Sequence, residues 1–146
     1  MFTKELHKYQ QSGKFSLTKA DNLVEVCNAP SGCAGVYLLY SLKNINPELI
    51  YIGRSGKIKS NGSLFIRKGG MKDRLVNGKQ FGQPRRHSWR QQMMTESIDS
   101  IRVHRYVTSD EKNLDCPKNV EGNLLKLHQQ HFGILPRWNC KLESVY

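Results

Sequence analysis

The stretch GVYLLYSLKNINPELIYIG, residues 35–53, contains two short apolar runs separated by a polar turn. Residues 34–41 and 48–53 are rich in Val, Ile, Leu and Tyr, which are residue types that strands favour. The intervening NINP is typical of a turn, so the stretch predicts an antiparallel β-hairpin. Each run carries a tyrosine close to a glycine, at Tyr37 and at Tyr51. Because a packed core needs only Val, Ile or Leu, the two phenols call for a functional explanation.

The remainder of the chain alternates helical patterns with one more strand pattern. Two segments combine good helix formers with apolar residues on one face, and a later segment alternates and is rich in β-branched residues. A further helix has an N-cap residue, a proline in its first turn and a glycine stop. The predicted elements are helices at 70–77 and 86–97, a strand at 98–108, and a helix that begins after Asp115 and ends at Gly133.

These elements predict a small α/β domain of the α+β type, with a three-stranded antiparallel sheet flanked by helices. At 146 residues the chain is most simply one domain. Near the N-terminus, SLTKADNLVEVCN fits either a short helix opened by Ser16 or Thr18 or an extended arm. We therefore expect an N-terminal extension over residues 1–33 and a domain over 34–146, with a basic insertion at about 54–90.

The positive charge of the chain is concentrated in this insertion. Eleven of the 23 basic residues lie between Arg54 and Arg90, where Asp73 is the only acid, so the segment carries +10 of the formal charge of +11. A nearly neutral scaffold with one cationic segment is typical of a protein that binds a polyanion. The charge distribution therefore favours nucleic acid as a partner over a merely solvated lysine-rich surface.

Other features of the sequence exclude several classes of protein. No apolar run approaches the ~18 residues that a membrane span needs, and the N-terminus lacks a signal-peptide core. The four cysteines include no C-x-x-C pair, which argues against a zinc ribbon or a disulfide framework. We expect a cytoplasmic protein of a bacterial or phage-type host, without contact to a membrane. The cysteines stand at positions 27, 33, 116 and 140.

Four short motifs occur in an order that resembles a known nuclease family. The hairpin carries GVY and YIG, the following helix carries Arg74 in KDRL, a later helix carries Glu121 in VEGNLLKLH, and Asn139 follows in PRWN. Over roughly residues 34–141 the chain resembles the GIY-YIG nucleases. The long basic insertion looks like the branch of that family formed by type II restriction endonucleases.

The resemblance implies a metal-dependent endonuclease that hydrolyses DNA, and it leaves open whether cutting is sequence-specific. Tyr51 or Tyr37 would orient or deprotonate the attacking water, and we favour Tyr51 as the base. A tyrosine has an ordinary pKa of about 10, and the nearby cations Arg54, Arg74 and Lys57 are expected to lower the pKa of Tyr51. Gly35 and Gly53 are interpreted as points of close approach for a phosphate backbone or the partner strand.

The other motif residues would handle the phosphate and the metal. Arg74 would contact the non-bridging phosphate oxygens, a task that suits a guanidinium. Glu121 would hold one divalent ion, Mg²⁺ or Mn²⁺, since such ions are typically bound by one or two carboxylates with water and phosphate. Asn139 would brace the site through hydrogen bonds.

The sequence departs from the family pattern at one position. Members often carry His or Tyr four residues after the helix arginine, and here that position is Gly78. Lys79 or another residue would take over that role, or the alignment of the helix would shift. Arg67 is then the rival of Arg74 as the catalytic arginine.

The basic insertion is expected to contact DNA through side chains that reach phosphates or base edges. Cutting both strands at a symmetric site would favour a homodimer. Two alternatives remain open, namely a nuclease-like domain that binds DNA without cutting it, and a basic RNA-binding protein. The expected contact residues are Lys59, Lys68, Lys72, Gln80, Gln83, Arg85, Arg86 and Arg90.

Overall fold

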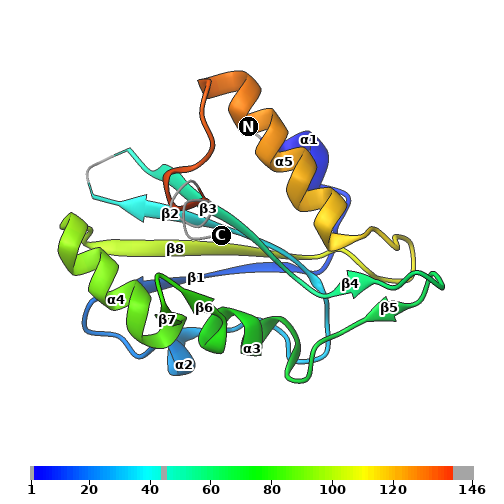
Figure 1. The fold of residues 1–146 in the computed structure, drawn as a ribbon, viewed down its shortest axis with the longest axis horizontal. Coiled ribbons are helices and arrows are strands. Elements are labelled where there is room, and N and C mark those ends of the chain that lie inside the picture. The colour runs from blue at the N-terminus through cyan, green and yellow to red at the C-terminus, as the bar shows by residue number, and fades with distance from the viewer. Residues whose placement is uncertain (1, 44–45, 140–146) are drawn as a thin grey trace.

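One antiparallel sheet of four strands lies at the centre of the molecule. The computed structural model describes residues 2–43 and 46–139. The strands are β1 (Ser12–Thr18), β2 (Gly35–Leu42), β3 (Glu48–Ser55) and β8 (Ser100–Val107). They are hydrogen-bonded in the order β1-β8-β2-β3, so β8 and β2 are internal and β1 and β3 form the two edges (Figure 1). The predicted hairpin is therefore present at one edge of the sheet, as β2 and β3.

The prediction of a three-stranded sheet is wrong, because the N-terminal segment supplies a fourth strand. β1 pairs with β8 along its whole length and continues through Ser16 and Thr18, where a helix start was one of the alternatives. Only Phe15 and Leu17 of β1 are buried. An edge strand that is solvated on one face has few apolar residues, so its sequence signal is weak. The segment 1–33 is thus integrated into the sheet.

The register of the hairpin directs both tyrosines to the same face of the sheet. Tyr37 lies opposite Gly53, and Leu39 lies opposite Tyr51. Directly opposed residues of an antiparallel pair share a face, so Tyr37 and Tyr51 are diagonal neighbours on it. Their ring centroids are 6.2 Å apart. A bulge follows at Leu39 and Tyr40, beyond the tyrosine pair.

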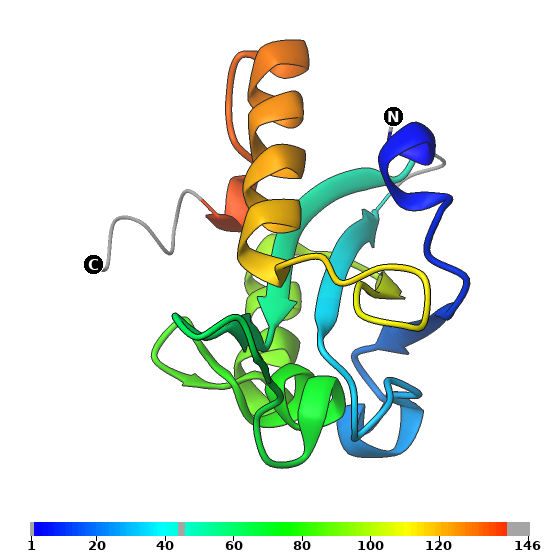
Figure 2. The same cartoon turned by 90° about the vertical axis from the view of Figure 1, so that its right-hand side faces the viewer.

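Helices cover both faces of this sheet. In Figures 1 and 2, α5 lies along one face together with α1, whereas α3 and α4 lie against the other. Two short ribbons, β4–β5 and β6–β7, lie within the basic segment, where no strand was predicted. The elements are α1 (Thr3–Leu6), α2 (Leu23–Val26), β4 (Lys57–Ile58), β5 (Leu64–Phe65), α3 (Gly70–Asn77), β6 (Lys79–Gln80), β7 (Gln83–Pro84), α4 (Arg85–Glu96) and α5 (Pro117–Phe132).

The three helices predicted in the second half of the chain are present within one or two residues of their expected bounds. The N-cap of α5 is Cys116 and not Asp115. The Asp115 carboxylate instead accepts a hydrogen bond from the Tyr9 hydroxyl at 2.6 Å. Residues 137–139 form a helical turn that carries Asn139. Cys140 and the end of the predicted domain, 140–146, lie outside the described residues.

Two hydrophobic clusters hold the layers together. The larger cluster lies between the sheet and α3–α4, and it includes Tyr37, Tyr51, Trp89 and Trp138. The smaller cluster lies between the opposite face and α5 with α1. Within the described part of the chain, no helix has the length and apolar character needed to cross a membrane. The two clusters hold the hairpin from both faces and thereby fix the position of the strand that carries Tyr51.

Candidate active site

A pocket of about 600 Å³ opens beside the end of β3. Residues from β3, the β4–β5 ribbon, α3 and α5 line it, so it brings together segments that are far apart in the sequence. The lining includes seven of the side chains predicted for catalysis or for its support. These seven residues are Tyr51, Arg54, Lys57, Arg67, Arg74, Glu121 and Asn139.

Tyr51 forms part of the pocket wall and is 4% exposed. Its hydroxyl oxygen accepts a hydrogen bond from Nη2 of Arg85 at 3.2 Å. Burial, followed by the neighbouring Tyr37, raises the pKa of Tyr51 to about 12, although Arg85 and Arg74 act in the opposite direction. The expectation of a lowered pKa is therefore wrong, because desolvation outweighs the nearby cations. At neutral pH this phenol is protonated in the free protein.

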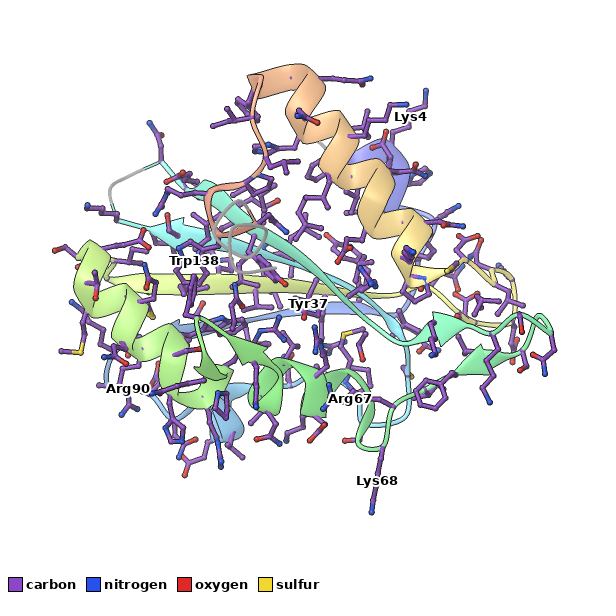
Figure 3. The ribbon with its side chains drawn as sticks, viewed as in Figure 1. Lys4, Tyr37, Arg67, Lys68, Arg90 and Trp138 are labelled. Atoms are coloured by element: carbon purple, nitrogen blue, oxygen red, sulfur yellow. The ribbon has the colours of Figure 1, made fainter. Side chains whose placement is uncertain are left out.

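Tyr37 lies behind the pocket and does not line it. The side chain is fully buried, between the sheet and the α3–α4 layer (Figure 3), and its hydroxyl has no hydrogen-bond partner among the described residues. A Cβ atom at Gly53 would lie 2.5 Å from the Tyr37 ring and 2.7 Å from the Tyr51 ring. Gly53 therefore makes room for the two rings, and Gly35 for the backbone oxygen of Tyr106. Both glycines thus allow the close approach of a neighbouring strand, which was one of the two expected uses, and neither lines the pocket.

Glu121 lies in the second turn of α5 and projects its carboxylate into the pocket. Its side chain is 14% exposed, and Arg54 at the end of β3 donates to it from Nη1 at 2.5 Å. Burial raises the pKa of Glu121, and the Arg54 guanidinium partly offsets this effect. The carboxylate is thus ionisable, desolvated and held by a cation whose own side chain is 42% exposed.

Two arginines of the basic segment reach the pocket in different states. Arg67 donates from Nη2 to the Asp73 carboxylate at 2.6 Å. Arg74, near the end of α3, also lines the pocket, but none of the ion pairs within the described residues includes it. The guanidinium of Arg74 is therefore the one of the two that has no carboxylate partner in the described part of the chain.

Asn139 fastens the edge strand next to Tyr51. Its side-chain oxygen accepts from the backbone N–H of Ile52 at 3.0 Å, and its Nδ2 donates to the Ile52 carbonyl at 2.9 Å. β3 is an edge strand, so these groups have no neighbouring strand on that side. The amide of Asn139 replaces one peptide unit of such a strand, and both of its polar atoms are used in doing so.

Two predicted DNA contacts lie in the interior and are corrected here. Gln80 and Arg85 are each only 1% exposed, so neither side chain is accessible to a nucleic acid. The Gln80 Oε1 accepts from Nε of Arg85 and from Nε1 of Trp89, both at 2.9 Å. Arg85 precedes Trp89 and Met93 by four and eight residues, and this spacing on the buried face of α4 is the signal that sequence reasoning missed.

The remaining predicted contacts are at the surface. Lys72 is half-buried, and Lys79, proposed as a substitute at the position after Gly78, is exposed and does not line the pocket. Lys68 points away from the loop before α3 into solvent (Figure 3). The exposed residues are Lys59, Lys68, Gln83, Arg86 and Arg90.

The donor set of the pocket fits a divalent ion that keeps most of its other ligands as water or phosphate. Within the described residues there is no group of three or more His, Cys, Asp or Glu side chains that could enclose a metal. Glu121 is the carboxylate in the pocket lining, and hard ions such as Mg²⁺ are commonly held by one or two carboxylates. The pocket therefore suits an open metal site and not a closed structural one.

Comparison of the chain with protein-family models, curated proteins and solved structures finds no match.

Proposed function

We propose that this protein is a metal-dependent endonuclease that hydrolyses phosphodiester bonds of DNA through the pocket beside β3. The observation that carries the proposal is the shared pocket of Tyr51, Arg74 and Glu121, three groups that come from separate elements. They are also the residues that the resemblance to the GIY-YIG nucleases assigns to catalysis. The strongly basic segment next to the pocket supports a polyanionic substrate.

Each group has a task in the hydrolysis of a phosphodiester. Arg74 contacts non-bridging oxygens, whose negative charge increases as the water attacks. Tyr51 hydrogen-bonds to the water or to a phosphate oxygen and thereby orients the reacting atoms. Asn139 holds the edge strand that carries Tyr51 in place through its bonds to Ile52.

Glu121 is the residue that would hold a divalent ion, Mg²⁺ or Mn²⁺, with water and substrate phosphate as further ligands. When bound, such an ion supplies Lewis-acid stabilisation of the phosphate and of the departing oxygen. Glu121 is paired with Arg54 in the free protein. Arg54 therefore has to give up this carboxylate, and its partly exposed guanidinium is then available to a phosphate of the substrate.

A plasmid assay tests the proposal. Supercoiled DNA is incubated with the protein and Mg²⁺, Mn²⁺ or EDTA, and nicked and linear products are measured. We expect metal-dependent cutting that falls by about 10³-fold in Glu121→Gln, while gel-shift binding is retained. Glu111→Gln, an exposed glutamate outside the pocket lining, is the matched control and should cut like the unchanged protein.

Other outcomes of this assay would assign a different function. Binding to DNA without cutting under any metal would favour a nuclease-like domain that only binds. A clear preference for structured RNA over DNA, again without cutting, would favour an RNA-binding protein. Cutting that persists in Glu121→Gln would refute the assignment of the pocket as the active site.

A further inference from the structure

Arg85 is a buried cation whose presence the hydrophobic core does not require. Its side chain is 1% exposed, and within the described residues it takes part in no ion pair. Burying a guanidinium without a carboxylate is expensive, and a Leu or Met of similar length would pack at a lower cost. A residue retained under such conditions is expected to have a role that an apolar side chain cannot fill.

All three nitrogens of the Arg85 guanidinium are engaged. Nε donates to Gln80 at 2.9 Å, Nη1 donates to the backbone oxygen of Arg74 at 2.7 Å, and Nη2 donates to the Tyr51 hydroxyl at 3.2 Å. The carbon of the guanidinium lies 5.5–5.6 Å from the ring centroids of Tyr37, Tyr51 and Trp89. Cation–π attraction to these rings partly replaces the missing counter-ion. The group is therefore fixed in position and orientation.

Gly78 provides the space in which this guanidinium lies. A Cβ atom at position 78 would be 2.5 Å from Nη1 of Arg85 and 2.4 Å from the Arg74 backbone oxygen. No side chain larger than hydrogen fits there while Arg85 keeps its place. Glycine at position 78, where the family often has His or Tyr, thus makes room for the buried side chain of Arg85.

The chemistry of the guanidinium determines which way the Tyr51 hydroxyl points. A guanidinium can only donate hydrogen bonds, so the phenol oxygen must be the acceptor in its contact with Arg85. The Tyr51 hydrogen is then directed away from Arg85, and no described residue accepts it. Tyr51 lines the pocket, so a group bound in the pocket is an available acceptor for this hydrogen.

We infer that Arg85 is a positioning residue of the site, which occupies the space left by Gly78 and fixes Tyr51 as a hydrogen-bond donor toward the pocket. The inference rests on the proposed function as far as the reaction is concerned, because the acceptor would be the attacking water or a phosphate oxygen. When Tyr51 loses its proton, the same guanidinium stabilises the phenolate. Arg85 acts through Tyr51 and does not itself touch the substrate.

The charged and titratable groups around Tyr51 come from four elements and have opposing effects. Tyr37 on β2 and Glu121 on α5 disfavour the phenolate, whereas Arg85 on α4 and Arg74 on α3 favour it. Arg85 is the only one of these groups with a hydrogen bond to the Tyr51 hydroxyl in the described structure. Orientation of the phenol is therefore the property that a substitution of Arg85 should change first.

Nuclear magnetic resonance of the full chain tests the contact without any assay of activity. The Nη2 and Nε protons of Arg85 should both exchange slowly with water. In Tyr51→Phe, exchange at Nη2 should become about 10-fold faster, since one charged hydrogen bond is lost, while Nε stays protected by Gln80. Tyr37→Phe is the matched control, because the Tyr37 hydroxyl has no described partner, and it should leave both rates unchanged. Equal Nη2 exchange in Tyr51→Phe and the unchanged protein would overturn the inference.

A double-mutant cycle tests the consequence for the reaction. Arg85→Lys should lower the cutting rate at saturating DNA by about 10–100-fold with little change in DNA binding, because the phenol is misplaced by a fraction of an ångström or more. In the Tyr51→Phe background the same change should cost less than about 2-fold. Equal losses in both backgrounds would mean that Arg85 is merely structural. If the unchanged protein does not cut, the proposed function fails, whereas the exchange experiment still decides on the Arg85–Tyr51 contact.

Discussion

Two regions border the pocket, and they hold their polar groups in different ways. The inner wall consists of Tyr51 and Asn139, with Arg85 behind Tyr51, and all three side chains are buried and hydrogen-bonded to other interior groups. The outer rim consists of Arg54 and Arg67, whose side chains are 42% and 33% exposed and are paired with acids.

The difference separates two tasks that a phosphodiester hydrolase must perform. Interior hydrogen bonds fix a group to within a fraction of an ångström, which the reacting atoms require. A partly exposed ion pair is worth little and exchanges easily, so the rim arginines can leave Glu121 and Asp73 for phosphates of the substrate. We therefore expect substitutions of the wall to change the rate of cutting, and substitutions of the rim to change binding.

The largest expected effect distinguishes Arg74 from Arg67, the two candidates for the catalytic arginine. Arg74 lines the pocket without a described carboxylate partner, whereas Arg67 is paired with Asp73. Arg74→Met should reduce the cutting rate by about 10²–10³-fold, and Arg67→Met by less than about 10-fold. Single-turnover cutting at saturating DNA measures both. The reverse order of the two losses would move the catalytic arginine to the rim.

The next effect concerns the stability of the inner wall. Gly53→Ala should lower the free energy of unfolding by about 2–3 kcal/mol, because its Cβ collides with the Tyr37 and Tyr51 rings, which are themselves packed. Urea denaturation followed by circular dichroism measures this loss. Gly122→Ala is the matched control. It lies in α5 with no atom within 4 Å of its Cβ, so it should gain about 0.5–1 kcal/mol. A neutral Gly53→Ala would mean that the two rings are not held against this glycine.

The same two regions differ in how well the sequence predicted them. The hairpin and the later helices follow from patterns within one segment, so they were predictable. The rim cations were also predictable, because charge is visible in composition. The fourth strand was missed, since Phe15 and Leu17 are its only buried residues. A strand with so few apolar residues is recognised only once its partner is known.

The properties of the inner wall depend on contacts that no local pattern contains. Of the cations expected to act on Tyr51, Arg74 does favour the phenolate, but burial outweighs it and raises the pKa of the phenol. The proximity of charges can be inferred from sequence, whereas the loss of water around a side chain requires the fold. Arg85 was read as a surface cation because its segment is basic, although its spacing to Trp89 already indicated the buried face.

A smaller effect tests whether burial of the Glu121 carboxylate lowers the stability of the protein. Burial raises the pKa of Glu121 above its ordinary value of 4.5. A carboxyl with a raised folded-state pKa binds its proton more tightly when folded, so it lowers stability as pH rises from below the unfolded pKa through the folded one. Glu121→Gln should therefore raise Tm at pH 7, because the partly exposed Arg54 remains solvated.

The pH dependence of this difference provides the control. At about pH 3.5 the glutamate is protonated in both states, so Tm of Glu121→Gln and of the unchanged protein should converge. Thermal melts by circular dichroism at the two pH values measure the difference in Tm between the two proteins. A lower Tm of Glu121→Gln at pH 7 would indicate that the Arg54–Glu121 pair stabilises the fold, and the rim would then not be exchangeable at this position.

The smallest effect concerns the exposed cations of the basic segment. Six basic residues between positions 54 and 90 are exposed in the structure. If all contact phosphates of double-stranded DNA, the logarithm of the binding constant should fall with the logarithm of salt concentration with a slope of about −5. The six exposed basic residues are Lys57, Lys59, Lys68, Lys79, Arg86 and Arg90.

Lys68 sharpens this expectation, because its side chain extends into solvent from the loop before α3 (Figure 3). Lys68→Met should make the slope less steep by about one and leave the cutting rate at saturating DNA unchanged. Lys126→Met, an exposed lysine of α5 outside the basic segment, is the matched control and should not change the slope. Fluorescence anisotropy over a range of salt concentrations measures all three proteins. An equal change in slope for the two variants would mean that DNA is not held by the basic segment. DNA binding would then have to be assigned to another surface of the protein.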